Sequence, residues 1–438
     1  PEFSGEGNSQ PVGTVAVIDI GKTNAKVALV AADSGAELAL RTISNAVRSD
    51  GPYPHFDAPH LWDFSLGAIA EICREHAIGA IVVVAHGAAG ALVSGDPDEA
   101  DGLALPVLDY EAPGPDATRG EYDRLRPPFS ETLSPRMTGG LNLGAQMFWQ
   151  QKRFPDAFRG ARYLTYPQYW AWRLTGVAAT EVTSMGCHTD LWNPVAGTFS
   201  SMVDRLGWRD LFPPLRPAFD QLGPVRPDLA RRMGLVRGTP VICGIHDSNA
   251  SLLPHLLRRD PPFSVVSTGT WVIVLAVGGE TDRLDPDRDG LAYVNAFGDP
   301  VPAGRYMGGR EYDRLTGGRT VEASLAEIDR VLAERIMALP SFTPGSGPFR
   351  KETGRWTRDP EALSVGERCT AAALYLALMT SECLEIAGGR GPALIEGPLA
   401  ANRLFCAGLA AVSGKPVFRS GERTGTPCTV SASRRGVA

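Results

Sequence analysis

The sequence predicts an α/β protein of two lobes, and three observations carry this prediction. The chain has 438 residues, whereas a single hydrophobic core stops growing at roughly 250 to 300 residues. Near its start, an apolar hairpin is followed by a helical pattern and a buried strand, the order of elements in an α/β lobe with a mixed sheet. A second apolar hairpin repeats the first and indicates a duplicated architecture, with a cleft between the lobes.

The first hairpin comprises residues 14–20 and 25–31, two runs rich in Val, Ile and Ala that a Gly-Lys-Thr-Asn link joins. Apolar residues at helical spacing over 60–78 predict a helix that Gly79 ends. Residues 80–85 predict a buried strand that runs into a glycine-containing loop. Together these elements form the beginning of the first lobe.

Two further helices are predicted in the first lobe. One covers residues 141–154 and is ended by Pro155, and the other covers 166–176 with Gly176 as its C-cap. The proline-rich stretch 208–240 predicts a loop that connects the lobes. We therefore place the first lobe at residues 12–243 and the second at residues 244–438.

The second lobe opens with a strand that leads into a polar loop, IHDSNAS, at residues 245–251. Residues 263–277 form the second hairpin, whose link contains Ser, Thr and Gly. Residues 369–389 are apolar on almost every helical face, as expected for a buried helix. Residues 392–418 predict a strand, a glycine-containing loop, a helix, a turn and a strand.

The composition is that of an ordinary globular protein, with 43% hydrophobic and 21% charged residues. The formal net charge of -6 provides no basic surface for nucleic acid. No run of about 18 apolar residues predicts a membrane span. Seven cysteines without disulfide or metal spacing indicate reduced thiols and a cytoplasmic protein. Residues 1–11 lack the pattern of a signal peptide and are expected to be a disordered tail or a cloning remnant.

The Gly21-Lys22-Thr23 link shares three letters with a nucleotide-binding P-loop. A P-loop needs another glycine five positions earlier and a helix afterwards, whereas here Ala16 and a second strand stand in those places. A hairpin tip can still bind phosphate through its N–H groups, the Thr23 hydroxyl and the charge of Lys22. Asp19 suits a hydrated Mg²⁺ ion. The alternative is an ordinary turn with a solvated lysine.

Asp247 follows a strand and is surrounded by small residues. A carboxylate there can act as a general base or a metal ligand. The alternative is an Asx-turn or a helix N-cap, which is the usual role of aspartate in such a sequence. No histidine has metal spacing to His246, so a structural role is favoured for that residue.

Five stretches, taken together, are specific enough to indicate a protein family. They are DIGKTNAKV (19–27), YPQYWAWRLTGVAATEVTSMGCHTDLWN (166–193), GTPVICGIHDSNAS (238–251), STGTW (267–271) and EGPLAANRLF (396–405). With these stretches in this order, the sequence resembles the FGGY family of carbohydrate kinases, within the superfold of hexokinase, Hsp70 and actin. The resemblance implies two ribonuclease-H-like lobes, with a sugar deep in the cleft and ATP held mostly by the second lobe.

The resemblance also implies roles for individual residues. Asp247 is expected to be the catalytic base and to contact the sugar, and Asp19 to lie near Mg²⁺. The residues expected to bind ATP and its phosphates are Gly21, Lys22, Thr23, Gly269, Thr270, Gly309, Gly397 and Asn402. The sugar-side candidates are His86, Asn142 and Gln146, followed by Asp109 and Glu111. For His86, a histidine satisfied by the backbone is an equal alternative.

The sequence departs from the family pattern in two places. Near the adenine site, where the family has a run of glycines, Gly397 is followed by Pro398 and Leu399. The end of the chain, residues 425–438, lacks the alanine- and glycine-rich closing helix of the family. The first departure leaves the nucleotide preference open.

We therefore expect an ATP- and Mg²⁺-dependent kinase that phosphorylates a primary hydroxyl of a small ketose. The stretches MGGREY (307–312) and GIHDSNAS favour a 6-deoxyketose such as L-fuculose or L-rhamnulose. One alternative is a sugar-binding sensor on a kinase scaffold, which the altered adenine-side loop motivates. Another, an actin-like or Hsp70-like ATPase, shares the fold but not the Asp247 loop. The expected partner is a small sugar, and a homodimer is left open.

Overall fold

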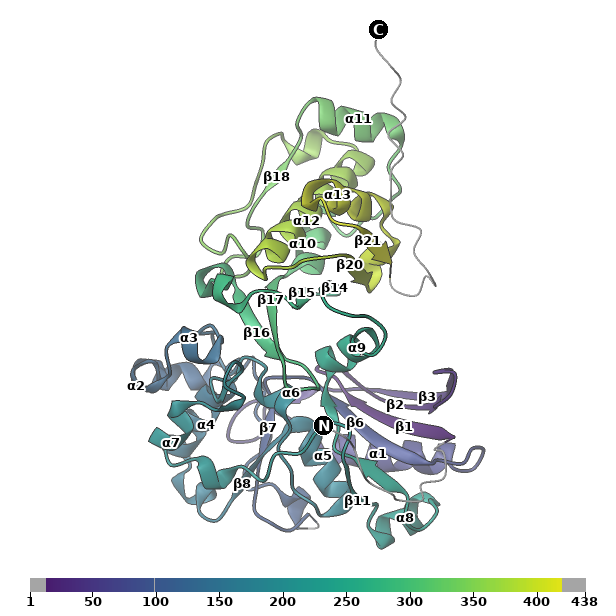
Figure 1. Cartoon of the computed structure of the whole chain (residues 1–438), viewed down its shortest axis with the longest axis vertical. Coiled ribbons are helices and arrows are strands. Elements are labelled where there is room, and N and C mark those ends of the chain that lie inside the picture. The colour runs from purple at the N-terminus through teal and green to yellow at the C-terminus, as the bar shows by residue number, and fades with distance from the viewer. Residues whose placement is uncertain (1–12, 98, 420–438) are drawn as a thin grey trace. The chain divides into compact units, whose positions relative to one another are not determined.

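The computed structural model describes residues 13–97 and 99–419, which form two compact units (Figure 1). The first unit comprises the described residues up to Thr132, Arg136–Pro254 and Val294–Asp299. The second comprises Leu133–Pro135, His255–Tyr293 and the described residues from Pro300 on. The expectations for residues 1–11 and 425–438 fall outside the described residues.

The first unit contains a mixed sheet, as the sequence predicts. Its strands run in the order β11-β12-β6-β1-β2-β3, with β13 also paired to β6. β1 and β2 form the antiparallel hairpin, whereas β6 runs parallel to β1, β12 and β13. The strand bounds are β1 (Thr14–Ile20), β2 (Asn24–Ala31), β3 (Glu37–Ser44), β6 (Ala80–Ala85), β11 (Gln221–Pro224), β12 (Pro240–Ile242) and β13 (Ile245–His246).

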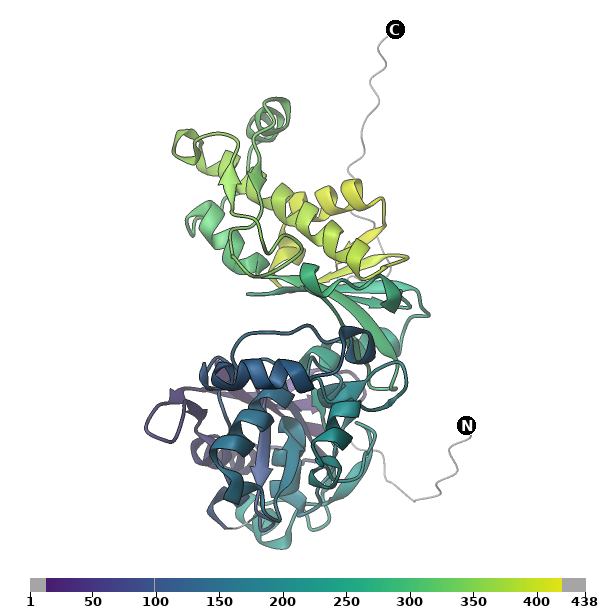
Figure 2. The same cartoon turned by 90° about the vertical axis from the view of Figure 1, so that its left-hand side faces the viewer.

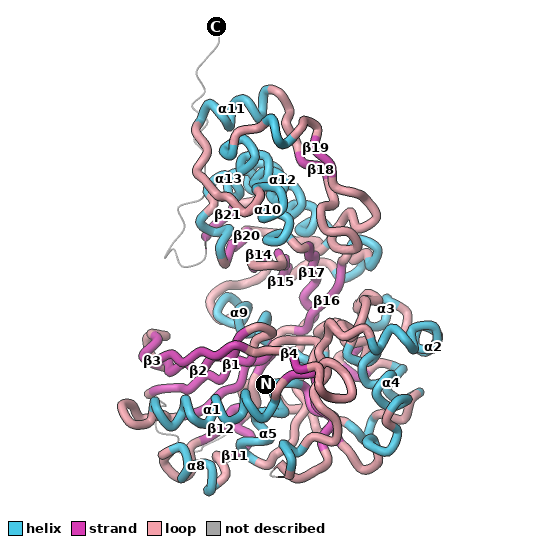
Figure 3. Tube along the Cα trace, turned by 180° about the vertical axis from the view of Figure 1, so that it is seen from behind, coloured by secondary structure: helices cyan, strands magenta, loops and turns pink. Residues whose placement is uncertain are grey.

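Alternate side chains of the hairpin point into the core, at Ala16, Ile18 and Ile20 on β1 and at Val27 and Leu29 on β2. Two helices, α1 (Ala58–Ile72) and α5 (Tyr166–Thr175), cover this face of the sheet. Both are labelled in Figure 3, which views the molecule from behind. Trp62 of α1 and Trp170 of α5 stack with ring centroids 6.3 Å apart. The apolar spacing of both segments is therefore explained by one shared core.

The structure corrects the bounds of the first predicted helix. It begins at Ala58 because the Asp57 side chain caps it by accepting from the backbone N–H of His60. It ends at Ile72, and the next residues form tight turns in which Arg74 and Glu75 donate to carbonyls three positions back. Gly79 thus follows a turn rather than the end of a helix.

The prediction that residues 208–240 connect the lobes is wrong. The segment contains β11 and helix α8 (Pro227–Met233), and both belong to the first unit. Prolines are tolerated there because Pro224 lies on an edge strand and Pro227 lies in the first turn of the helix. Further α-helices among the described residues of this unit are α2 (Arg119–Leu125), α3 (Phe129–Thr132), α4 (Leu143–Arg153), α6 (Val182–Met185) and α7 (Ser201–Arg205). Its short strands are β4 (Val47–Arg48), β5 (His55–Phe56), β7 (Gly90–Val93), β8 (Arg162–Thr165), β9 (Trp192–Asn193) and β10 (Thr198–Phe199).

Residues 244–254, which we placed in the second lobe, lie in the first unit. β13 pairs with β6, and Ile245 packs with Ala218, Ala250 and Leu253 in a small apolar cluster. The expected polar loop at 247–251 is the start of a helix, α9 (Asp247–Leu256).

The second unit repeats the strand arrangement of the first. Its described strands run in the order β16-β17-β15-β14-β20-β21. The hairpin β14–β15 pairs with a parallel strand, β20, on one side and an antiparallel strand, β17, on the other. In the same way, the β1–β2 hairpin of the first unit lies between the parallel strand β6 and the antiparallel strand β3. The bounds are β14 (Phe263–Thr268), β15 (Val272–Val277), β16 (Gly290–Val294), β17 (Pro300–Tyr306), β20 (Ala393–Glu396) and β21 (Val417–Arg419), with a separate pair, β18 (Ala338–Leu339) and β19 (Arg355–Trp356).

A long buried helix, α12 (Val365–Ile386), packs on the second sheet beside α13 (Arg403–Ser413), as Figure 2 shows. Among the described helices α12 alone is long and apolar enough to cross a membrane, but 72% of its apolar window is buried within the structure. It is therefore the predicted core helix. Two other helices, α10 (Gly308–Thr316) and α11 (Leu325–Ala333), complete the described helices of this unit.

A buried carboxylate supports the start of α9 from within the first unit. Glu181 caps α6 by accepting hydrogen bonds from the backbone N–H groups of Thr183 (2.9 Å) and Ser184 (3.2 Å). It also accepts from the Thr183 hydroxyl, whose oxygen accepts in turn from the backbone N–H of His246 at 3.1 Å. Burial raises the pKa of Glu181 to about 7, although these hydrogen bonds lower it.

Glu181 should make the stability of the protein depend on pH. Its pKa in an unfolded chain is about 4.3, so between that value and about 7 the folded protein binds more protons. Glu181 makes its full contribution to the free energy of unfolding below pH 4.3. This contribution, on the order of 3 kcal/mol, is lost as the pH rises through 7. Urea unfolding at pH 5 and pH 8 should therefore show the wild type losing stability relative to Glu181→Gln. The exposed Glu75→Gln is the control, and equal differences at both pH values would contradict this account.

Candidate functional site

Three parallel strands of the first unit end at one edge of the sheet and bring the main candidates together. Asp19 on β1 and Ile245 on β13 are both in register with Val84 of β6. Asp19 therefore lies at the end of β1, His86 directly after β6, and Asp247 directly after β13. Polar groups separated by more than 200 residues in sequence thus meet at the carboxyl ends of adjacent strands, where α/β folds commonly bind ligands.

Asp247 has one anchored and one free carboxylate oxygen. Its Oδ1 accepts hydrogen bonds from the backbone N–H of Ser248 at 2.6 Å and from the Ser248 hydroxyl at 3.3 Å. The Nε2 of buried His246 lies 3.1 Å from the same oxygen. Among the described residues none donates a hydrogen bond to Oδ2, and 41% of the side chain is exposed. The carboxylate is fixed at one oxygen and available to a ligand at the other.

Asp19 lies close enough to Asp247 for the two charges to interact. Burial raises the pKa of Asp19, Asp247 raises it further, and the nearby ammonium of Lys26 lowers it. Two carboxylates that repel each other in a partly buried site favour a cation between or beside them.

His246 touches Asp247 but is neutral at physiological pH, because burial lowers its pKa. Its Nε2 also lies 3.6 Å from the thiol sulfur of Cys187. Gly87 makes this packing possible, since a Cβ at that position would lie 2.6 Å from His246 Nε2. The sequence favoured a structural role for His246, and its contact with Asp247 was missed although the two residues are adjacent.

His86 presents an unused acceptor. Its Nδ1 lies 2.8 Å from the carbonyl of Gly87, so Nδ1 carries the proton and donates. The buried Nε2 has no hydrogen-bond partner among the described residues, and burial lowers the pKa of the ring and keeps it neutral. The ring packs against the buried rings of Phe56 and Tyr166, with centroid distances of 5.0 and 5.1 Å. This packing fixes the imidazole and leaves Nε2 to accept from a hydroxyl donor.

Gln146 and Asn142, the two amide candidates on α4, differ in their availability. Gln146 donates through Nε2 to the carbonyls of Ala88 and Gly140, and its buried Oε1 has no partner in the described part of the chain. Asn142 accepts from the N–H of Met137 and donates to the carbonyl of His188. Gln146 therefore has an acceptor to offer, whereas Asn142 uses both ends of its amide to hold neighbouring backbone.

The tip of the β1–β2 hairpin is held by its own backbone and by Asn45, which follows β3. The Gly21 N–H donates to the carbonyl of Asn24, and Asn45 bonds the carbonyls of Gly21 and Thr23. Thr23 is exposed, and its hydroxyl oxygen accepts from the Asn24 amide. Lys22 does not extend into solvent but pairs with the carboxylate of Asp109.

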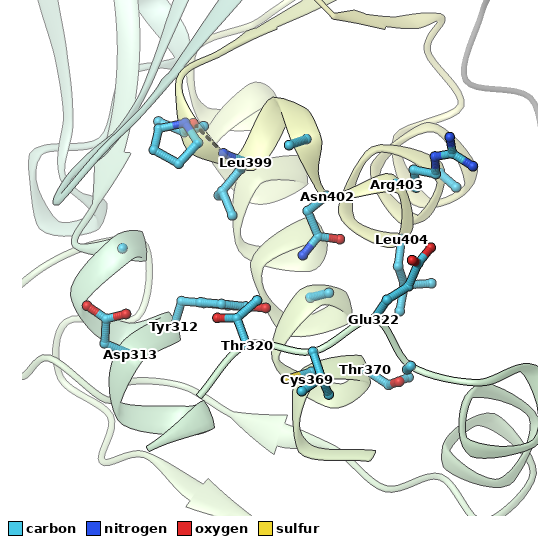
Figure 4. A pocket seen from close by; sticks show the side chains of 18 of the residues that line it. Tyr312, Asp313, Thr320, Glu322, Cys369, Thr370, Leu399, Asn402, Arg403 and Leu404 are labelled. Atoms are coloured by element: carbon cyan, nitrogen blue, oxygen red, sulfur yellow. Dashed lines mark hydrogen bonds between the residues drawn. The ribbon is translucent and has the colours of Figure 1, made fainter. Parts of the chain in front are cut away.

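The second unit holds the remaining candidates around a cavity of about 1130 Å³. Gly269 and Thr270, in the exposed turn between β14 and β15, line it together with Gly309 and Asn402. Figure 4 shows Asn402, which caps α13, pointing toward the space bounded by Tyr312, Thr320 and Cys369. The cavity is large enough for a nucleotide.

Sequence reasoning missed one wall of this cavity. Residues 320–323 and the start of α12, at Cys369 and Thr370, line it. Nothing in the local sequence of these segments marks a ligand site. They could be found only by knowing that α12 packs against α10.

Gly309 and Gly397 are explained by close packing of backbone. A Cβ at Gly309 would lie 2.1 Å from the carbonyl oxygen of Gly269, and a Cβ at Gly397 would lie 2.0 Å from that of Thr268. Gly397 also has a φ of +79°, which disfavours other residues. Gly397 itself does not line the cavity, but Pro398 and Leu399 after it do.

Comparison with known proteins gives two consecutive family matches. Residues 130–254 match the N-terminal domain of the FGGY family of carbohydrate kinases, and residues 260–436 match the carbohydrate kinase FGGY C-terminal domain. A solved carbohydrate kinase from Novosphingobium aromaticivorans is 37% identical, with a TM-score of 0.86 over 94% of this chain and 90% of that one. The chain belongs to the FGGY family of carbohydrate kinases. The predicted family and fold class are thereby confirmed.

Other FGGY proteins match with lower identity. An L-fuculokinase from Salmonella typhi is 29% identical over 281 residues, 61% of this chain and 57% of that protein. The match thus spans just over half the length of this curated relative. A xylulose kinase from Lactobacillus acidophilus is 14% identical with a TM-score of 0.77 over 93% of this chain and 86% of that one, a likeness of fold alone.

The packing of this FGGY chain predicts a contrast between two glycines of the cavity. Gly309→Ala should destabilise the second unit by about 1 to 3 kcal/mol, because its methyl group would overlap the Gly269 carbonyl. Gly269→Ala should cost much less, since the nearest atom to its Cβ is 3.9 Å away. Urea unfolding of both variants checks this, and equal losses of stability would contradict it.

Proposed function

We propose that this protein is an ATP-dependent cytoplasmic kinase that phosphorylates a primary hydroxyl of a small ketose, with 6-deoxyketoses such as L-fuculose preferred. The observation that carries the proposal is the free Oδ2 of Asp247, whose carboxylate interacts with the charge of Asp19 at the edge of the first sheet. Membership of the FGGY family supports the reaction, and the relatives named L-fuculokinase support the substrate.

In this proposal Asp247 is the general base. Its Oδ2 accepts the proton of the attacking hydroxyl as the new oxygen–phosphorus bond forms and the bond to the ADP oxygen breaks. Ser248 keeps the carboxylate in one orientation through Oδ1, so the free oxygen need not be positioned during the reaction. Phosphoryl transfer demands little more of the protein than positioning and charge stabilisation.

The sugar is proposed to bind in the first unit. The bare acceptors of His86 and Gln146 would each take a hydroxyl hydrogen. Phe56 and Tyr166 pack against His86 and make its surroundings apolar, which suits a methyl group in place of a hydroxyl, as in a 6-deoxyketose. Asn142 is proposed to act on the backbone around the sugar rather than on the sugar itself.

The nucleotide is proposed to bind in the cavity of the second unit. The exposed turn at Gly269 and Thr270 offers N–H groups and a hydroxyl to phosphate oxygens, and Leu399 with Tyr312 offers apolar surface to the base. Gly21 and Thr23 remain proposals for phosphate contact from the first unit.

The residues fit a Mg²⁺ ion. No group of three or more His, Cys, Asp or Glu that could hold a metal occurs among the described residues, but Mg²⁺ is commonly held by one or two carboxylates, water and substrate phosphates. Asp19 would hold it, since its charge is partly buried and repelled by Asp247. When bound, the ion would neutralise charge on the transferred phosphoryl group.

A sugar-binding sensor is the second candidate, because Pro398 and Leu399 replace the expected glycines. The cavity beside them favours the kinase, since a sensor that has lost nucleotide binding has no need of it. Calorimetry that detects sugar binding without nucleotide binding would favour the sensor.

A coupled assay of ADP release with 6-deoxyketoses, pentuloses, hexuloses and glycerol tests the proposal. We expect turnover on at least one ketose and a loss of roughly two to four decades in kcat for Asp247→Asn, with sugar binding nearly intact. The control is Asp204→Asn, an exposed aspartate paired with Arg209 far from the site in sequence. Absence of turnover on every sugar by a folded protein would overturn the kinase, and an unchanged kcat would overturn the role of Asp247.

A further inference from the structure

Lys22 lies in a closed environment of carboxylates and aromatic rings. Its Nζ pairs with Asp109 Oδ1 and lies 3.6 Å from Glu111 Oε2. The same nitrogen lies 5.0 Å from the ring centroid of Phe56 and 4.7 Å from that of Tyr110. The side chains of Lys22 and Asp109 are only 19% and 8% exposed, so water screens their attraction weakly.

The aromatic rings that cover Lys22 also surround His86. The His86 ring centroid lies 5.0 Å from that of Phe56 and 5.6 Å from that of Tyr110. The positive charge of Lys22 also contributes to lowering the pKa of His86. The ammonium group is therefore part of the surroundings of the proposed sugar acceptor, rather than a free charge at the hairpin tip.

The charged groups that face this region are predominantly acidic. They are the carboxylates of Asp19, Asp109, Glu111 and Asp247 and the ammonium groups of Lys22 and Lys26. The two histidines, His86 and His246, add no positive charge because burial keeps them neutral. An anionic ligand would meet net negative charge, and the half-buried ammonium of Lys22 is already paired.

We propose that the Lys22–Asp109 pair sets the class of substrate, so that the site accepts neutral sugars and rejects sugar acids. The inference rests on the proposed sugar site. A sugar carboxylate would have to displace Asp109 from Lys22 or remain unpaired beside four carboxylates, and both are unfavourable. Such selectivity is not general in the family, since the name of one relative from Escherichia coli, 27% identical over 165 residues, joins a neutral ketose and a sugar acid, L-xylulose/3-keto-L-gulonate kinase.

The test compares a neutral ketose with a sugar acid, L-xylulose or L-fuculose against 3-keto-L-gulonate and D-gluconate. The wild type should favour the neutral sugars. Asp109→Asn keeps the shape of the side chain and one acceptor for Lys22 but removes the negative charge that neutralises the Lys22 ammonium. The ratio of kcat/KM for acids to that for neutral sugars should therefore rise by at least about tenfold. Glu111→Gln, at an exposed residue, should shift it less in the same direction. Adding Lys22→Met to Asp109→Asn should remove the gain.

A matched control separates local from general charge effects. Asp156→Asn removes an equal charge from an exposed pair with Arg159 and should leave the ratio unchanged. Wild-type preference for the acids, or an unchanged ratio in both Asp109→Asn and Glu111→Gln, would overturn the proposal.

Calorimetric binding of the same sugars distinguishes this proposal from that of kinase activity. If no sugar is phosphorylated but neutral sugars still bind and Asp109→Asn admits the acids, the kinase fails and the selectivity stands. If neither neutral nor acidic sugars bind the folded wild type, the proposed sugar site and its selectivity are both overturned.

Discussion

The parallel pairing of β6 with β1 on one side and with β13 on the other is the constraint on which the candidate site depends. Each strand ends at the same edge, and a polar residue lies within one position of each end: Asp19 just before the end of β1, His86 just after β6 and Asp247 just after β13. Because the register is fixed by buried apolar side chains such as Ile18 and Val83, a slip of one residue would turn Asp19 into the core. The hydrophobic core thus determines where the charges lie.

Burial at this edge then determines the charge of each group. The histidines are neutral and the carboxylates repel each other. The proposed sugar would therefore meet hydrogen-bond acceptors, and the proposed metal ion would meet an excess of negative charge. Lys22 does not correct the deficit, because Asp109 and Glu111 outweigh it. A surface with this balance is suited to neutral hydroxyl compounds and to a metal-bound phosphate rather than to a bare anion.

Local sequence patterns predicted the hairpins and the core helices because those features depend on neighbouring residues, whereas the family was predicted from five stretches between residues 19 and 405 taken together. The contact of Lys22 with Asp109 could not be predicted in this way, since the two residues are 87 positions apart and meet only when the fold is complete. The prediction for segment 208–240 was wrong for another reason. Its prolines occupy an edge strand and a helix start, where proline is tolerated, and a count of prolines cannot distinguish these positions from a loop.

The repeated hairpin shows how one arrangement of strands can carry two chemistries. In both units the hairpin lies beside a parallel strand, so Ser267 on β14 occupies the place of Asp19, and Pro398, two residues after the end of β20, occupies that of His86. In the first unit these places hold a carboxylate and an imidazole. In the second they hold a hydroxyl and a proline, neither of which carries a charge that would repel a phosphate. Gly397, in the place of Ala85, lets the backbone approach the Thr268 carbonyl closely. The proposed sugar site and the proposed nucleotide site therefore differ in the side chains at equivalent strand ends, although the arrangement of strands is the same.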